Sequence, residues 1–347
     1  MFVRPLVTLA VTVVALGAAA CGTGTTGTGA SGDAARAAGE GKTQYPVTIS
    51  NCGKDYTFDK APSRVVLMNG GSVAEVSSIL ALGVQGSVVA NAQSYGASDV
   101  PGRAEAIKAL PTGGVALNAQ QDIPREAMLG LRPDFVISTY EGGFSSETGF
   151  ATRDDLAGIK ANTYVPGVSC GATGTVAGTP TIEDSYALLR DLGKIFDVPG
   201  RAEQVIAESK KRIEEATAAV AGKPTKNVLL VFPGMGADDF SSIAAAGVWN
   251  DVLAKAGGAN PFDDPAGTMF ATVSKEKLAT TAIDAVIVVN YMNPDPEGSA
   301  KKILAQFPQW EAAKNQRFLI LSDSVYFGPS NDVAVDKIAD LLHADGS

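Results

Sequence analysis

Residues 181–222 read TIEDSYALLRDLGKIFDVPGRAEQVIAESKKRIEEATAAVAG, and they are the best guide to the fold of this chain. The second part of this stretch places apolar or small residues at i, i+3 and i+4 spacing with lysine and glutamate between them, which is the pattern of one amphipathic helix. These positions are Val205, Ile206, Ser209, Ile213, Ala216 and Val220. A helix from Gly200 to Ala221 would have about 22 residues and a length of about 33 Å, which is enough to join two lobes.

A shorter helix is expected to begin near Thr181, because Asp184 follows three residues later in the position of a capping box. Residues 198–200, Val-Pro-Gly, separate it from the long helix. A flexible linker would be rich in glycine and serine, so a helical connection predicts two lobes held at a nearly fixed separation. The alternative is an ordinary surface helix inside one large domain.

The N-terminus carries the features of an export signal. After a single charge, Arg4, an apolar run over residues 6–20 ends in small residues just before Cys21. An apolar run this short is typical of a secretory signal rather than a transmembrane span. It is similar to a bacterial lipoprotein signal, whose cysteine becomes the lipidated first residue, although alanine stands at position 18 where that signal normally has leucine. We therefore expect a signal peptide over residues 1–20 and lipidation at Cys21.

Residues 21–44 are expected to form a lipid-anchored flexible tether, because they are rich in glycine, threonine and alanine and cannot build a core. If Cys21 carries lipid, Cys52 and Cys170 remain as one pair in an exported, oxidising setting. This arithmetic predicts a disulfide between them. Two unrelated buried thiols are the alternative.

The composition limits the kinds of ligand. The 347 residues, 45% of them hydrophobic, suffice for two cores. The formal net charge of −9 gives no support to binding of nucleic acid, which needs basic clusters. A neutral or cationic ligand fits this charge better.

Short β-rich runs alternate with helical stretches on both sides of residues 181–222, after a small hairpin over residues 46–58. Strands are expected at residues 65–68, 86–90, 135–138 and 162–165, and again at 228–232, 285–289 and 318–321. This repetition predicts an α/β fold of two Rossmann-like lobes. The expected domains are an N-terminal lobe over residues 45–180, bridging helices over 181–222 and a C-terminal lobe over 223–347.

The two halves also match in detail. Glu126 lies eight residues before Asp134 in EAMLGLRPDFVIS, and Glu276 lies eight residues before Asp284 in EKLATTAIDAVIV. An acidic residue in a first helical turn favours the helix dipole by about 0.3–1 kcal/mol and needs no other role. As a pair at equivalent positions of two lobes, however, the two carboxylates suit a partner with two-fold symmetry.

Several stretches, in this order, resemble the substrate-binding lipoproteins of ATP-driven (ABC) importers for ferric siderophores, haem and cobalamin, the helical-backbone class of periplasmic-binding-protein-like proteins. The stretches are RVVLMNGGSVAEVSSILALGV, LRPDFVIS, DVPGRAEQVIAESKKRI, VSKEKLATTAIDAVIV and PQWEAAKNQRFLILSDSVYFG. The resemblance implies two lobes with a ligand cleft between them, a rigid bridging helix and small lobe motion. It also implies that Glu126 and Glu276 dock into arginine pockets on the two permease subunits. A monomer anchored outside the cytoplasm is expected.

Candidate ligand-binding residues follow the strands, because ligands of open α/β lobes lie beyond the carboxyl ends of the strands. They are Asn69, Asn91, Tyr95, Tyr140 and Glu141 in the first lobe, and Phe232, Met235, Tyr291, Tyr326 and Phe327 in the second, with Trp249 and Phe270 on following segments. An aromatic cleft with a few polar groups suits a bulky chelate. For each aromatic residue taken singly, packing in the core is the alternative.

The residues directly after the strands suggest the charge of the ligand. Family members that bind anionic chelates commonly use cleft arginines, but no basic residue directly follows a predicted strand, and Arg103 and Arg153 lie on other segments. Acidic residues are near instead, at Glu141, Asp238, Asp239 and Asp323. They favour a neutral or cationic ferric hydroxamate, unless they are simply solvated loop residues.

Other functions find little support. The only histidine is His343, near the C-terminus, whereas a bare zinc or manganese site usually draws on histidine and a Ser-His-Asp or Cys-His site needs one as its base. Residues 234–236, Gly-Met-Gly, are only a fragment of a dinucleotide-binding motif. We therefore expect no enzyme activity, no resident cofactor, and iron only within a chelated ligand. The second choice of ligand is cobalamin, haem or another bulky cofactor, and the rival of another class is an exported enzyme on the same bilobal scaffold.

Overall fold

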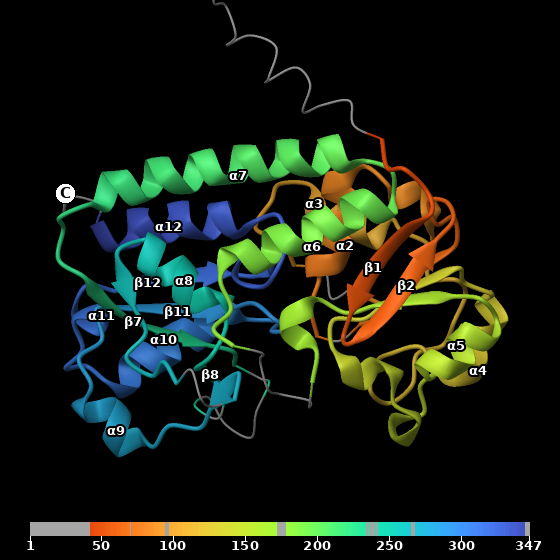
Figure 1. The fold of residues 1–347 in the computed structure, drawn as a ribbon. Coiled ribbons are helices and arrows are strands. Elements are labelled where there is room, and N and C mark those ends of the chain that lie inside the picture. The colour runs from red at the N-terminus through yellow and green to blue at the C-terminus, as the bar shows by residue number, and fades with distance from the viewer. Residues whose placement is uncertain are drawn as a thin grey trace, which may run out of the picture.

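One long helix, α7 (Pro199–Val220), runs along a whole side of the molecule and crosses from one lobe to the other (Figure 1). The computed structural model describes residues 42–69, 71–93, 97–171, 178–233, 235, 240, 242–264 and 268–343. The helix has 22 residues, and all six positions of its predicted apolar stripe are buried. Proline at its first position fixes a helical φ without loss of an intrahelical hydrogen bond. The predicted bridging helix is confirmed.

A second helix, α6 (Ile182–Ile195), precedes α7 and packs against it. The predicted capping box is present: the Asp184 carboxylate accepts a hydrogen bond from the backbone N–H of Thr181 at 2.8 Å. The two helices approach closely at Gly193, where an added Cβ would lie 2.6 Å from the Cβ of Ala202. Only glycine fits this crossing.

The N-terminal lobe, which lies at the right of Figure 1, is built on a parallel sheet of four strands in the order β4-β3-β5-β6. The strands are β3 (Val65–Leu67), β4 (Val88–Asn91), β5 (Phe135–Ile137) and β6 (Asn162–Tyr164). The helices are α2 (Ala74–Leu82), α3 (Arg103–Lys108), α4 (Arg125–Leu131) and α5 (Arg153–Gly158), with 3-10 turns η1 (Gln85–Ser87), η2 (Glu141–Phe144), η3 (Ser146–Thr148) and η4 (Gly167–Ser169). The strand expected from residue 86 begins later because η1 occupies its first positions. The hairpin, β1 (Val47–Asn51) with β2 (Lys54–Phe58), lies at the outer edge of this lobe.

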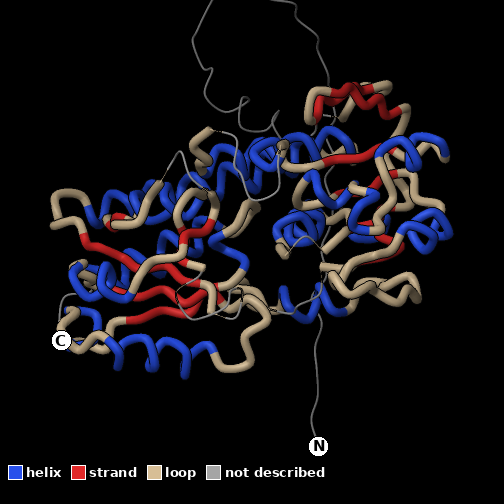
Figure 2. The backbone as a smooth tube through the Cα atoms, turned by 90° about the horizontal axis from the view of Figure 1, so that it is seen from below, coloured by secondary structure: helices blue, strands red, loops and turns tan. Residues whose placement is uncertain are grey.

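The C-terminal lobe has three parallel strands, β7 (Lys226–Val231), β11 (Ala285–Val289) and β12 (Phe318–Leu321), as predicted. Three two-residue strands were not predicted: β8 (Ile243–Ala244), β9 (Gly258–Ala259) and β10 (Phe270–Ala271). The helices are α8 (Val248–Lys255), α9 (Lys275–Thr280), α10 (Pro296–Gln306), α11 (Glu311–Lys314) and α12 (Asn331–His343), with a 3-10 turn η5 (Asp323–Val325). Figure 2 shows the sheets of the two lobes side by side, each flanked by helices.

The hydrophobic core is continuous from one lobe to the other. One buried cluster includes Val65 and Leu67 of β3, residues of α6 and α7, and Leu230 of β7. Two further clusters fill the outer part of each lobe, around Met128 and around Trp310. The bridging helices are therefore part of the core of both lobes, which opposes independent motion of the lobes.

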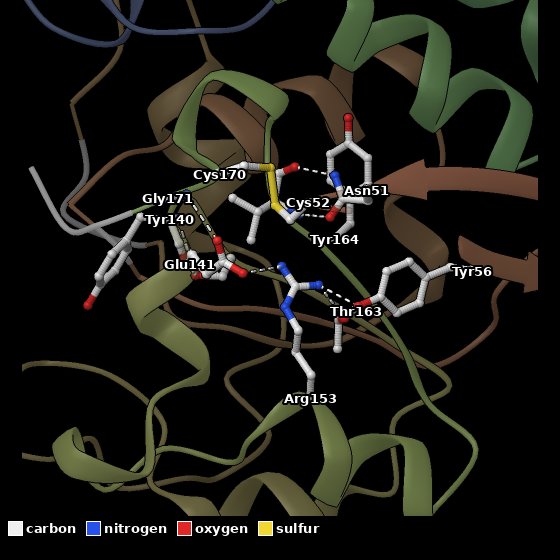
Figure 3. The surroundings of a disulfide bond; sticks show 12 residues. Asn51, Cys52, Tyr56, Tyr140, Glu141, Arg153, Thr163, Tyr164, Cys170 and Gly171 are labelled. Atoms are coloured by element: carbon white, nitrogen blue, oxygen red, sulfur yellow. Dashed lines mark hydrogen bonds and ion pairs between the residues drawn. A yellow bond between two sulfur atoms is a disulfide. The ribbon is translucent and has the colours of Figure 1, made fainter. Parts of the chain in front are cut away.

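The predicted disulfide between Cys52 and Cys170 is present (Figure 3). Cys52 lies in the turn of the β1–β2 hairpin and Cys170 directly follows η4, so the bond joins positions 118 residues apart. Asn51 adds a second link, because its side chain donates to the carbonyl oxygen of Val165 at 2.6 Å and accepts from the N–H of Val165 at 3.0 Å. The hairpin is thereby fixed to the segment after β6.

Buried carboxyl groups make the stability depend on pH. Burial raises the pKa of Glu75, Asp191, Asp323 and Asp332 above the ordinary value. The contribution of such a group to the free energy of unfolding is largest below its unfolded pKa of about 4. This contribution is lost as the pH rises through the folded pKa. Asp155 acts in the opposite sense, because hydrogen bonds from Arg125 hold the pKa of its carboxyl far below the ordinary value, and its contribution is lost in strong acid.

We therefore expect the midpoint of thermal unfolding to be highest in mildly acidic solution and to fall by a few degrees toward pH ~8. Calorimetry at constant ionic strength measures this. Asp191→Asn should flatten the profile, because the amide oxygen can still accept the 2.8 Å hydrogen bond from the Tyr164 hydroxyl but the group no longer titrates. A midpoint that rises steadily from pH ~5 to ~8 would contradict the assignment.

Candidate ligand-binding site

A cavity of about 470 Å³ lies between the two lobes. Its lining comes from loops that follow strands β3, β5, β6, β7, β11 and β12, from the start of α8 and from β10. The lining residues are Asn69, Gly71, Ser72, Gln120, Asp122, Thr139, Tyr140, Phe150, Ser169, Met235, Gly247, Val248, Trp249, Thr268, Met269, Phe270, Tyr291, Tyr326 and Phe327. Eight of the twelve predicted residues are among them. The carboxyl ends of the strands of both lobes therefore face one shared space.

The C-terminal lobe forms an aromatic wall of this cavity. The rings of Trp249 and Phe270 are stacked with centroids 5.8 Å apart. Phe232 does not line the cavity, but its ring lies 4.9 Å from that of Phe270 and 5.8 Å from that of Tyr326 and supports both from behind. Trp249 can take this place only because residue 247 is glycine, since a Cβ there would overlap the indole ring. The wall is a packed cluster of aromatic rings.

The N-terminal lobe forms a more polar wall, lined by Asn69, Ser72, Asp122, Thr139 and Tyr140. Burial, and then the nearby Asp122 carboxylate, raises the pKa of the Tyr140 hydroxyl, which therefore stays protonated. Within the described part of the chain, no lysine or arginine lines the cavity. The site thus combines aromatic rings, a few hydrogen-bonding groups and one acidic residue.

Other predicted residues do not line the cavity. Asn91 is buried, and its side chain hydrogen-bonds the backbone of Gln93. Glu141 lies in a separate polar pocket of about 220 Å³ together with Arg153. Tyr95, Asp238, Asp239 and Cys21 lie outside the described residues.

The two arginines that were considered for the cleft are also elsewhere. Arg103 donates to the carbonyl oxygen of Ser77. The Arg153 guanidinium donates to the hydroxyls of Tyr56 and Thr163 and lies 3.8 Å from the Glu141 carboxylate, beside the disulfide (Figure 3). Neither lines the cavity.

Several lining residues were not predicted, and the sequence gives a signal for only some of them. Thr139 precedes Tyr140 directly after β5, and Ser72 lies in the same loop as Asn69. Because ligands lie beyond the carboxyl ends of strands, Thr139 and Ser72 could have been predicted. Gln120, Asp122, Thr268 and Met269 lie in loops that do not follow a predicted strand. Their position depends on how the loops fold, and no motif marks them.

Asp323, also predicted near the ligand, does not line the cavity but links the two lobes. It is 3% exposed and its carboxylate accepts hydrogen bonds from the Ser98 hydroxyl and the N–H of Asp99. In return, the Asp99 carboxylate accepts hydrogen bonds from the N–H groups of Ser322 and Ser324. This reciprocal contact fixes the turn that leads into Tyr326 and Phe327.

Asp134 and Asp284 show that the two lobes share one plan. The N–H of Asp134 donates to the carbonyl oxygen of Arg64 at 3.0 Å, and the N–H of Asp284 donates to that of Asn227 at 2.8 Å. Each carboxylate also accepts a hydrogen bond from the N–H of the same partner. The two aspartates therefore occupy equivalent positions.

Glu126 and Glu276, eight residues before these aspartates, are accordingly equivalent too. Both are exposed in the first turn of their helices, α4 and α9. Hydrogen bonds from its own N–H and from Ser274 lower the pKa of Glu276, so that it is ionised. Figure 1 shows α4 and α9 in different lobes, both on the side of the molecule that faces away from α7.

Two observations concern metals and membranes. In the described ranges, no three side chains of histidine, cysteine, aspartate or glutamate gather in a way that could hold a metal ion. Among the helices of the same ranges, none combines the length and the apolar character that a membrane crossing needs.

Two α/β lobes, a long bridging helix and an aromatic cavity between the lobes define a bilobal binding protein. A family model described as periplasmic binding protein matches residues 71–325. The chain belongs to this family, as the sequence resemblance predicted.

Solved structures show the same fold. A periplasmic binding protein from Veillonella parvula matches with a TM-score of 0.69 and 19% identity over 87% of this chain and 98% of that one. An ABC-type Fe3+-hydroxamate transport system structure from Saccharomonospora viridis matches with a TM-score of 0.67 and 24% identity over 86% and 99%. A periplasmic haem-binding protein from Roseiflexus sp. RS-1, in its apo form, matches with a TM-score of 0.61 and 20% identity over 81% and 98%.

Proposed function

We propose that this protein is the extracytoplasmic substrate-binding component of an ABC importer, anchored through Cys21, and that its ligand is a ferric siderophore of the neutral or cationic hydroxamate type. It binds the ligand, delivers it to the permease and performs no catalysis. Membership of the periplasmic binding protein family and the fold shared with a structure from an Fe3+-hydroxamate transport system support this proposal.

The observation that carries the proposal is a pair of unpartnered polar atoms in the aromatic wall. Trp249 Nε1 and Tyr326 Oη are buried and have no hydrogen-bond partner among the described residues. Both side chains line the cavity. A buried N–H or O–H without a partner is destabilising. Neither atom has exposed surface in this structure, so both side chains would have to turn toward the cavity before the carbonyl and hydroxamate oxygens of a ferric hydroxamate accept their hydrogen bonds, while its hydrocarbon parts contact the aromatic rings.

The charge of the cavity favours hydroxamates over catecholates. A ferric tris-hydroxamate core is neutral, whereas a ferric tris-catecholate core is anionic and needs cations around it. The described lining contains Asp122 and no basic side chain. An anionic chelate would therefore meet repulsion without compensation.

Haem is the second candidate, and Tyr326 is the observation that favours it. A phenol oxygen can ligate haem iron, and the Tyr326 hydroxyl lies unpartnered in the cavity wall of the described structure. Burial, however, raises the pKa of this hydroxyl well above its ordinary value, which opposes the phenolate that ligates best. We therefore place haem after the hydroxamates.

Tryptophan fluorescence tests the proposal. The chain has two tryptophans: Trp249 lines the cavity, and Trp310 is buried in the outer core of the C-terminal lobe. We expect saturable quenching, with one ligand per protein, by a neutral or cationic ferric hydroxamate, and weaker quenching by its iron-free form. Most of the quenching should persist in Trp310→Phe and be lost in Trp249→Phe.

The same titration separates the alternatives. A ferric catecholate, haem and cobalamin complete the panel. Tighter binding of the catecholate would contradict the charge argument, and saturation by haem or cobalamin alone would favour the second candidate. The recovered ligand is then analysed by mass spectrometry, because an enzyme on this scaffold would return it chemically altered.

A further inference from the structure

Glu75 is a fully buried acid directly behind the polar wall of the cavity. It lies in α2 with no exposed surface. Its Oε2 atom accepts a hydrogen bond from the Thr139 hydroxyl at 3.0 Å and one from Gln93 Nε2 at 2.9 Å. Thr139 lines the cavity, and so does Ser72. The carboxyl group is thus one side chain away from the ligand space.

Burial raises the pKa of Glu75, but the hydrogen bonds from Thr139 and Gln93 act against this and favour its ionised form. The orientation of the Gln93 amide is fixed, because its Oε1 accepts from the N–H of Val76 at 3.0 Å and its Nε2 donates to the carbonyl oxygen of Met68 at 2.8 Å. Gln93 therefore presents a donor to Glu75. An ionised carboxylate only accepts hydrogen bonds, which matches this surrounding.

No counter-charge for Glu75 is found in the described part of the chain. Among the described residues, no lysine, arginine or histidine forms an ion pair with it, and its Oε1 atom has no hydrogen-bond partner. A buried charge without compensation is strongly unfavourable, and its field reaches far because the surroundings have a low dielectric constant. The nearest space that could hold a cation is the cavity.

The two walls of the cavity therefore differ in charge. The N-terminal wall has Asp122 in its lining and Glu75 directly behind it, while the described lining of the C-terminal wall is aromatic or neutral. A ligand with one cationic end and an apolar body would have a single preferred orientation in such a cavity. Its body would contact the aromatic rings, and its cation would face the N-terminal wall.

We propose that Glu75, acting with Asp122, makes this protein selective for chelates that carry an alkylammonium group, which is held toward the N-terminal wall. This inference rests on the proposed function and specifies the ligand class of the same site. Glu75 acts here as a specificity-determining residue through its charge, without direct contact with the ligand.

A pair of chelates that differ by one charge tests the proposal. The probes are a linear ferric trihydroxamate with a terminal ammonium group and the same chelate with that amine acetylated. Their dissociation constants are measured by fluorescence titration at mildly alkaline pH, and the ratio of the two is compared between proteins. If Glu75 had a purely structural role, its substitution would disturb the wall and change both dissociation constants by the same factor. The ratio of the two would then stay the same.

The wild type should prefer the ammonium form, and Glu75→Gln should reduce that preference by roughly 10- to 20-fold, as expected for a unit charge at ~10 Å and an effective dielectric constant of ~20. Asp122→Asn should reduce it as well. The matched control is Glu105→Gln, an exposed acid of the same lobe on α3, which should leave the ratio unchanged.

Equal affinity of the wild type for both forms, or an unchanged ratio in Glu75→Gln, would overturn the role of Glu75 while the proposed function stands. If no member of the chelate panel binds, the proposed function fails and the inference with it. If Glu75→Gln does not fold, the role of Glu75 is tested with Asp122→Asn. A preference for the ammonium form that remains in Asp122→Asn would support a contribution of the Glu75 charge, and complete loss of the preference would refute it.

Discussion

Reversal of both Glu126 and Glu276 to lysine is expected to reduce import by at least ~100-fold. Each reversal breaks a charge pair, which costs about 2–5 kcal/mol of binding free energy at an interface, and replaces it by repulsion. We propose that these carboxylates dock on the two permease subunits. They are exposed on equivalent helices, α4 and α9, on the side away from α7 (Figure 1). Uptake of iron-labelled chelate by cells that contain only the variant measures the effect.

Ligand affinity is expected to stay within twofold of the wild type, since neither glutamate lines the cavity. Each single reversal should give an intermediate loss of import. The matched control reverses Glu147 and Glu297, which are also exposed acids at the start of a helix or turn, one in each lobe. Import that survives the double reversal at Glu126 and Glu276, or that is lost equally in the control, would refute the docking role.

The sequence predicted the large elements well because their patterns are local. The stripe of α7 repeats over 22 residues, and strands such as Ala285–Val289 are fully apolar because helices cover both faces of a parallel sheet. The two-residue strands lack such a pattern. Phe270–Ala271 is a strand only because it pairs with Ile243–Ala244, and that partner is chosen by the tertiary fold.

The lining of the cavity was predicted where it follows the ends of strands and was missed where it lies in other loops. Asn69 and Asn91 both follow a strand, yet only Asn69 lines the cavity, because the side chain of Asn91 hydrogen-bonds the backbone two residues later. Glu75 did carry a signal, as a single acid in the otherwise small or apolar helix AEVSSILAL. Its burial behind the wall, however, depends on Gln93 and Thr139, which are distant in the sequence.

Removal of the disulfide in Cys52→Ala/Cys170→Ala should lower the free energy of unfolding by about 4–5 kcal/mol, as the chain-entropy model gives for a closed loop of this size. The bond spans 118 residues, so its loss frees a third of the chain in the unfolded state. Urea unfolding of the variant and of the oxidised wild type measures the difference. A shared midpoint would show that the bond does not contribute to stability.

The same experiment shows in which state the bond acts. The folded hairpin keeps its link to the segment after β6 through the two hydrogen bonds between Asn51 and Val165, so the native structure should change little without the disulfide. The unfolded chain, by contrast, expands, and the urea dependence of the unfolding free energy should become steeper. Ser169, next to Cys170, lines the cavity. Ligand affinity therefore shows whether the folded structure near the bond has changed. Unchanged ligand affinity with a steeper urea dependence would assign the stabilisation to the unfolded chain, whereas weaker binding would show that the bond also holds the cavity wall in place.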